Sequence, residues 1–169
     1  MLQILLVDDL REELGFLQRT LQQCKILNPQ VLLQSGQECI SFFRANQSPE
    51  RSARFLVFLD LVMSPVSGIA VLRHLKNLGL SEESLFVMLS GISDIKGINE
   101  GYQLGARTFM IKPVKPDDVM EVLNAMRSKI IVEERPEGYL LDWNVPVSKP
   151  TVPQTPDTAF LKKGVSLSA

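Results

Sequence analysis

The chain contains the sequence FLVFLD at residues 55–60, five apolar residues followed by an aspartate. Three further apolar runs also end on polar residues: ILLV before Asp8 and Asp9, FVML before Ser90, and FMI before Lys112. Uninterrupted apolar runs are typical of strands in a parallel sheet, which is covered on both faces. The carboxyl ends of such strands meet at one edge, where ligands bind. We therefore expect three carboxylates, a hydroxyl and an ammonium to gather there.

Amphipathic segments alternate with these runs, which is the pattern of a parallel α/β protein. Leu14, Leu17 and Leu21 share one face of the first expected helix. The sequence therefore predicts a doubly wound five-stranded parallel sheet, for which we expect the common strand order 2-1-3-4-5. Strands are expected at 3–7, 31–34, 55–59, 85–89 and 108–111, and helices at 11–24, 37–45, from Gly68 to a stop at Gly79, at 95–104, and from Pro116 with Ile130 on the inner face.

The expected helix at 95–104 has the weakest support, because Gly97 and Gly101 each cost up to about 1 kcal/mol relative to alanine. A helix that propensity barely supports is a candidate for a moving element. We expect any conformational response of the domain to involve it.

Composition indicates one domain with an appendage, since 169 residues with 45% hydrophobic content can bury a substantial core. Cys24 and Cys39 lie in expected helices without a CxxC motif, so we expect reduced thiols. The net charge of −1 gives no bias toward nucleic acid or anionic membrane. Met1 precedes a strand without a basic leader, and no apolar run is long enough to span a bilayer, so we expect a cytoplasmic protein without membrane attachment.

The pattern changes near residue 132. Five of the ten prolines follow Glu133, without helical or strand periodicity. We interpret 1–131 as the domain and 132–169 as a Pro-rich extended or disordered, irregular tail. Its one apolar patch contains Tyr139 and Trp143, which could pack on the domain, on a second subunit, or lie in solvent. The tail is too short and irregular for a DNA-binding module.

Asp8, Asp9 and Asp60 would lie together, because strands 1 and 3 are neighbours in the expected order. Adjacent carboxylates repel one another unless a hard cation neutralises them, and Mg²⁺ accepts such oxygen ligands. The simpler alternative is that Asp8 and Asp9 end a strand and cap a helix. The presence of Asp60 favours the metal.

A carboxylate beside Mg²⁺ can attack phosphorus and form an acyl phosphate. Phosphoryl transfer depends on alignment and charge neutralisation. Lys112 would supply a cation and Ser90 a hydrogen-bond donor, and Gly91 leaves the approach open. Each residue alone has an ordinary explanation, as a turn serine or a solvated lysine. Only their shared edge makes them specific.

Over residues 1–131 the chain resembles the receiver domain of two-component response regulators, which has a flavodoxin-like fold. The resemblance rests on several motifs together. They are the acidic pair Asp8-Asp9, the segment DLVMSPVSG at 60–68, Ser90-Gly91, and GARTFMIKP at 105–113.

The resemblance implies that Asp60 is the phosphoacceptor. It implies that Asp8, Asp9, Asp60 and the backbone carbonyl of Val62 hold Mg²⁺, and that Ser90 and Lys112 contact the phosphoryl oxygens. Phe109 matches the aromatic switch position. The Lys112–Pro113 peptide bond is expected to be cis, a form that only X-Pro bonds adopt at low cost.

Two departures from the family pattern concern the site. Ser64 stands where the family usually has proline, and Pro65 follows it. Val62 and Ile92 are both apolar at positions that flank the attacking water in this family, so we expect slow self-dephosphorylation.

The implied function is that of a response regulator in a phosphorelay. It would receive its phosphoryl group from a sensor histidine kinase or a histidine phosphotransfer protein. It would signal to a downstream protein through the helix 4–strand 5–helix 5 face, as a monomer or weak homodimer. Apart from its own phosphorylation and dephosphorylation it would not be an enzyme. The alternatives are a Mg²⁺-dependent phosphohydrolase with an aspartyl nucleophile and a phosphorylation-independent scaffold with the same fold.

Overall fold

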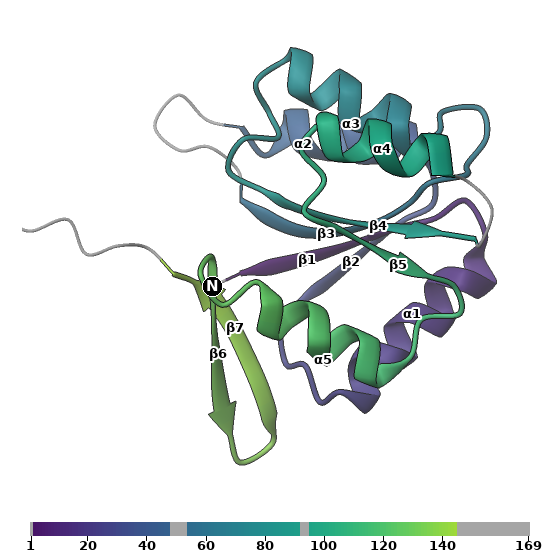
Figure 1. Ribbon diagram of the computed structural model, residues 1–169. Helices are drawn as coiled ribbons and strands as arrows, with labels where there is room; N and C mark the ends of the chain where they lie inside the picture. Colours follow the sequence, from purple (N-terminus) through teal and green to yellow (C-terminus); the bar gives the residue numbers. More distant parts are fainter. Residues whose placement is uncertain (1, 48–53, 92–94, 145–169) are drawn as a thin grey trace, which may run out of the picture.

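The computed structural model describes residues 2–47, 54–91 and 95–144, which form three layers (Figure 1). The central parallel sheet has the order β2-β1-β3-β4-β5. Helices cover both faces of the sheet. The fold class and strand order expected from the sequence are therefore confirmed. The sheet consists of β1 Gln3–Val7, β2 Gln30–Leu33, β3 Phe55–Asp60, β4 Leu85–Ser90 and β5 Thr108–Ile111; α2 Gly36–Ala45, α3 Gly68–Asn77 and α4 Ile95–Gln103 lie on one side, and α1 Arg11–Gln23 and α5 Pro116–Ala125 on the other.

Each face of the sheet has its own apolar core, because successive side chains of a strand point to opposite faces. In β1, Ile4 and Leu6 join the core that includes α1 and α5, whereas Leu5 and Val7 join the core that includes α2 and α3. Every residue of β3 is buried. The strand that carries Asp60 is thus packed from both sides along its whole length.

Helix α3 ends where the sequence predicts. Gly79 has a φ of 68°, a left-handed conformation that glycine adopts without steric cost, and its amide donates to the Lys76 carbonyl at 3.0 Å. At the other end, the Ser67 hydroxyl accepts a hydrogen bond from the Ala70 amide at 3.2 Å. This cap fixes the start of α3 just after the loop that follows Asp60.

The chain after α5 differs from the expectation. The helix ends at Ala125, and Ile130 belongs to β6 Ile130–Arg135, which pairs antiparallel with β7 Gly138–Trp143. The expected irregular tail is therefore wrong for residues 132–143. Apolar side chains alternate along these residues, and Ile130 and Leu141 are buried in the core of α1 and α5. The prolines in this part of the sequence obscured that alternation. Residues 145–169 lie outside the described residues.

The β6–β7 hairpin is attached to the amino end of the sheet by a buried asparagine. The Asn28 side-chain amide donates to the carbonyls of Leu2 at 2.7 Å and Leu141 at 2.8 Å, and its oxygen accepts from the Leu141 amide at 2.7 Å. The Tyr139 amide also donates to the Lys25 carbonyl at 2.7 Å. The hairpin is consequently part of the folded domain.

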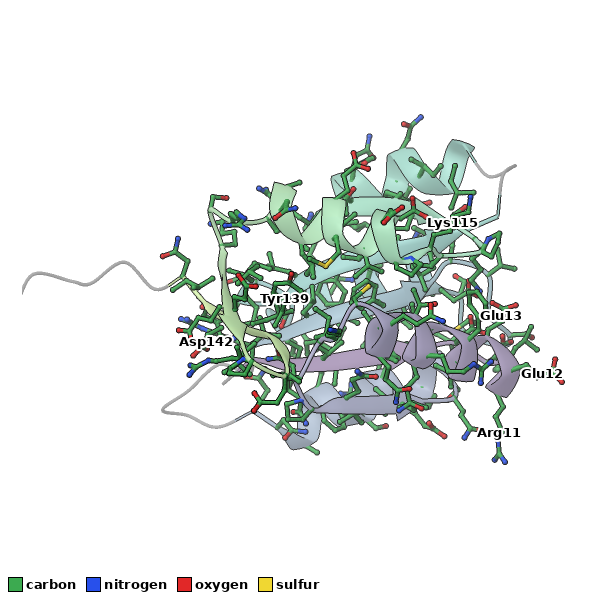
Figure 2. The ribbon with its side chains drawn as sticks, turned by 90° about the horizontal axis from the view of Figure 1, so that it is seen from below. Arg11, Glu12, Glu13, Lys115, Tyr139 and Asp142 are labelled. Atoms are coloured by element: carbon green, nitrogen blue, oxygen red, sulfur yellow. The ribbon has the colours of Figure 1, made fainter. Side chains whose placement is uncertain are left out.

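The aromatic residues of the hairpin pack on the domain itself. Tyr139 and Trp143 are partly buried against the core of α1 and α5. Figure 2 shows Tyr139 on the hairpin at the opposite end of the molecule from Arg11 and Glu12, which begin α1. Of the three alternatives for these aromatic residues, packing on the domain is the one observed.

We predict that Asn28→Ala lowers the free energy of unfolding by about 2–4 kcal/mol, because it leaves buried backbone groups of Leu2 and Leu141 without partners. Urea denaturation measures the change. Asn46→Ala is the control, since the Asn46 side chain makes an exposed hydrogen bond to the Phe42 carbonyl and its loss should cost less than about 1 kcal/mol. Equal losses in the two variants would contradict the role of Asn28.

Candidate functional site

Three carboxylates meet at the carboxyl edge of the sheet. Asp8 follows β1 and Asp60 ends β3, and these neighbouring strands pair in register up to Val7 and Leu59. One oxygen from each of Asp8, Asp9 and Asp60 lies within 4.8 Å of the others. Asp8 and Asp60 are only 2% and 5% exposed. Buried charges of one sign need compensation, so this group demands a cation.

Lys112 supplies part of that compensation from the end of β5. Its ammonium lies 2.6 Å from Oδ2 of Asp8 and 2.8 Å from Oδ1 of Asp60, with Glu13 farther away at 3.9 Å. The Lys112 amide donates to the Ser90 carbonyl at 2.9 Å, which holds the backbone against β4. The Lys112–Pro113 bond is cis, as expected.

The environment changes the proton affinity of both partners. Burial raises the pKa of Asp60; the hydrogen bond and charge of Lys112 oppose this, and the charges of Asp8 and Asp9 add to it. Burial tends to lower the pKa of Lys112, but the hydrogen bonds and charges of Asp60 and Asp8 outweigh it, so its pKa is raised. The site therefore favours the charged form of Lys112 and disfavours the ionised form of Asp60.

The carboxylate group can bind a metal ion. Its donors are all oxygens, which is the ligand chemistry of hard cations such as Mg²⁺. The raised pKa of Asp60 fits this interpretation, because a divalent cation would relieve the repulsion that Asp8 and Asp9 exert on it.

Ser90 is the last residue of β4, and the residue before it, Leu89, pairs with Asp60. The structure thus places Ser90, which is buried, at the carboxyl edge of the sheet as expected. Its hydroxyl donates to the Gly91 carbonyl at 2.7 Å. Contact between this hydroxyl and a phosphoryl oxygen stays a prediction.

The loop from Leu61 to Ser67 makes contacts that the sequence did not indicate. The Ser64 amide donates to Oδ2 of Asp9 at 3.0 Å, so the residue that departs from the family pattern holds a carboxylate of the site. The peptide bond between Ser64 and Pro65 is also cis. The Val62 side chain is largely exposed, and Ile92 lies outside the described residues.

Gly68 allows this loop to close on Asp60. A Cβ at position 68 would lie 2.1 Å from the Asp60 carbonyl oxygen, far inside any tolerated contact. The Gly68 amide donates to the Leu61 carbonyl at 3.1 Å. A glycine immediately before an amphipathic segment was the one available signal for this close approach.

Phe109 lies on the α4 side of the sheet. Its partly buried ring is 4.9 Å from the Tyr102 ring and packs against the core of α2 and α3. A Cβ on Gly101 would lie 2.5 Å from its Cζ atom, so α4 sits close on this ring. The structure therefore places Phe109 between α4 and the sheet.

The model of the response regulator receiver domain family matches residues 4–124 of this chain. The chain therefore belongs to the response regulator receiver domain family. Members of this family are typically signalling proteins without enzymatic turnover, and they typically interact with histidine kinases. Among the described residues, no helix combines the length and apolar character needed to cross a bilayer.

Two curated relatives match parts of the chain. The chemotaxis protein CheY of Bacillus subtilis (strain 168) is 29% identical over 69 residues, which cover 41% of this chain and 56% of that protein. The probable transcriptional regulator ycf27 of Porphyridium aerugineum is 30% identical over 84 residues, which cover 50% of this chain and 31% of that protein. The chain thus matches less than two thirds of either relative.

Solved structures agree on the fold. The bacteriophytochrome response regulator AtBRR is 26% identical, with a TM-score of 0.62 over 73% of this chain and 91% of its own. The Vibrio cholerae chemotaxis protein CheY4 is 21% identical, with a TM-score of 0.61 over 74% of this chain and 98% of its own. The second likeness concerns the fold alone.

We predict that Gly68→Ala destabilises the protein by roughly 2–4 kcal/mol, because the added methyl group collides with the backbone of Asp60. Urea denaturation measures the loss. Gly91→Ala is the matched control beside the same site, since a Cβ there meets nothing within 4 Å. A tolerated Gly68→Ala would contradict the close packing of the loop.

A second prediction concerns Asp60→Asn in the presence of EDTA. The folded-state pKa of Asp60 is raised above its unfolded value, so the wild type loses stability as pH rises from about 4 through the folded pKa. The amide does not titrate. The variant should therefore gain stability relative to the wild type as pH increases, measured by thermal unfolding. If the variant instead lost stability relative to the wild type as pH rises, the ion pair with Lys112 would outweigh burial in setting the pKa of Asp60.

Proposed function

We propose that this protein is a phosphoacceptor response regulator that receives a phosphoryl group on Asp60. The observation that carries the proposal is the buried Asp60 carboxylate, which lies within reach of Asp8 and Asp9 and 2.8 Å from the Lys112 ammonium. The donor would be the phosphohistidine of a sensor histidine kinase or a histidine phosphotransfer protein. In the transfer, the P–N bond to the histidine breaks and a P–O bond to Asp60 forms.

Each residue of the site has a separate role in the proposed transfer. Asp60 is the nucleophile, and Lys112, already beside Oδ1 of Asp60, neutralises charge on the transferred phosphoryl oxygens. Rotation of the Ser90 hydroxyl away from the Gly91 carbonyl would offer a further donor. Asp8, Asp9, Asp60 and the Val62 carbonyl would hold Mg²⁺, which when bound supplies charge neutralisation for the phosphoryl group.

Phosphorylation adds roughly two negative charges at Asp60. If Ser90 moves toward them, space opens for Phe109, and α4 responds because Gly101 packs on that ring. The protein would then signal by changing its partners on the α4–β5–α5 face. The apolar, exposed Val62 offers no hydrogen bond to an attacking water, which supports slow loss of the phosphoryl group.

Acetyl phosphate with Mg²⁺ tests the acceptor. We predict that the wild type gains the mass of one phosphoryl group, that Asp60→Asn stays unlabelled, and that labelling of Lys112→Ala is about 10²-fold slower because a stabilising charge is lost. Intact mass spectrometry gives the readout. Asp117→Asn, which removes an exposed carboxylate at the start of α5, is the control and should label like the wild type.

Equal labelling of the wild type and Asp60→Asn would place the acceptor elsewhere. Continuous turnover of a small phosphate ester would favour a phosphohydrolase, although Val62 occupies the position where such enzymes carry a second acid. A wild type that resists labelling would favour a phosphorylation-independent scaffold.

A further inference from the structure

Helix α4 has little internal support. It has nine residues, two of which are Gly97 and Gly101, and it has neither an acidic residue in its first turn nor a basic residue in its last. Glycines weaken a helix, and charges at the termini would normally complement its dipole. The position of α4 must therefore depend on neighbouring elements.

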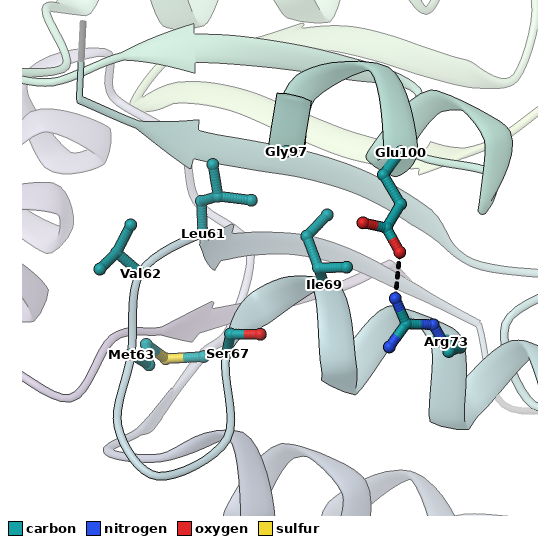
Figure 3. Close-up of a pocket in the computed structure, with 8 residues that line it drawn as sticks. All are labelled: Leu61, Val62, Met63, Ser67, Ile69, Arg73, Gly97 and Glu100. Atoms are coloured by element: carbon teal, nitrogen blue, oxygen red, sulfur yellow. Dashed lines mark hydrogen bonds and ion pairs between the residues drawn. The ribbon is translucent and has the colours of Figure 1, made fainter. Parts of the chain in front are cut away.

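Helix α3 provides two cationic contacts to α4. The Arg73 guanidinium forms an ion pair with the Glu100 carboxylate (Figure 3). The Lys76 ammonium donates to the Gln103 carbonyl at 2.9 Å, at the carboxyl end of α4. Arg73 and Lys76 are three residues apart and so share a helix face. Lys76 supplies the positive charge that the last turn of α4 lacks.

Helix α4 is packed tightly on its sheet side but borders a cavity on the side of the loop after Asp60. On the sheet side, Gly101 lies against Phe109 in tight contact. Toward the loop after Asp60, a cavity of about 460 Å³ opens; its lining is Leu61, Val62, Met63, Ser67, Ile69, Arg73, Gly97 and Glu100. Both residues of the Arg73–Glu100 pair line this cavity, which lies between α4 and the loop (Figure 3).

We propose that Arg73 and Lys76 form a clamp that holds α4 against α3, and that the strength of this clamp sets how readily the domain adopts its phosphorylated arrangement. The second half rests on the proposed function. Arg73 and Glu100 are 51% and 43% exposed, so the pair is weak and sensitive to salt. A weak restraint suits a switch, because a ligand shifts a two-state equilibrium only by its differential affinity.

Hydrogen exchange in the unphosphorylated protein tests the first half. In Glu100→Gln and in Lys76→Gln, the amide hydrogens of residues 98–106 should exchange about two- to fivefold faster than in the wild type, because α4 opens more often. Raising the NaCl concentration to about 1 M should speed this exchange in the wild type and change it little in the double variant Lys76→Gln/Glu100→Gln.

Glu83→Gln provides the matched control. Glu83 pairs with Arg54 at 2.7 Å and is 44% exposed, but this pair joins the residues before β3 and β4 and includes no residue of α3 or α4. Its loss should leave the exchange of residues 98–106 unchanged. Combining Arg73→Glu with Glu100→Arg should restore slow exchange. Exchange that is unchanged in both clamp variants, or that rises equally in Glu83→Gln, would overturn the clamp.

Binding of beryllofluoride with Mg²⁺, a mimic of the phosphorylated state, tests the second half. The double variant Lys76→Gln/Glu100→Gln should bind about two- to fivefold more tightly than the wild type, because less free energy is needed to release α4. Equal affinities would overturn this half. A wild type that does not bind beryllofluoride would instead overturn the proposed function, and the exchange experiment would still decide the clamp.

Discussion

The contact of the Lys112 ammonium with Asp8 and Asp60 is the interaction on which the site depends. It joins the ends of three strands, since Lys112 follows β5, Asp8 follows β1 and Asp60 ends β3. Taking these charges out of water is costly, and their mutual attraction and hydrogen bonds offset the cost only in this geometry. The sheet holds that geometry because both of its faces are packed.

Strand β1 is held at both ends, and this fixes where the carboxylates lie. At its beginning the Leu2 carbonyl accepts from Asn28, which also binds Leu141 of the hairpin. At its end Asp8 accepts from Lys112 and from the amide of Leu10 at 2.9 Å. The hairpin and the acidic site occupy opposite ends of the sheet. The hairpin therefore stabilises the sheet at the end away from the carboxylates.

The sequence predicts the sheet and most of the site for a simple physical reason. A strand buried on both faces needs a continuous apolar run, and the polar residue that ends each run must lie at the common edge, which places Asp8, Asp60 and Lys112 together. The hairpin was not predicted because Pro136, together with the prolines from Pro146 onward, masked a short alternation of apolar residues. The close approach of Gly68 to Asp60 depends on loop geometry, which residue types alone do not determine.

The contacts between α3 and α4 could not be predicted either, because helical periodicity shows which residues share a face but not which helix lies opposite. Within the described structure, α4 is held by weaker contacts than α5 and the hairpin. The turn after α5 is closed by a hydrogen bond from the Lys129 amide to the Met126 carbonyl. The hairpin that follows this turn is anchored to the sheet. Helix α4 is held by the exposed Arg73–Glu100 pair, by Lys76 and by the contact of Gly101 with Phe109. If Asp60 accepts a phosphoryl group as proposed, we expect α4 to move, because its contacts are with exposed charged side chains and one aromatic ring.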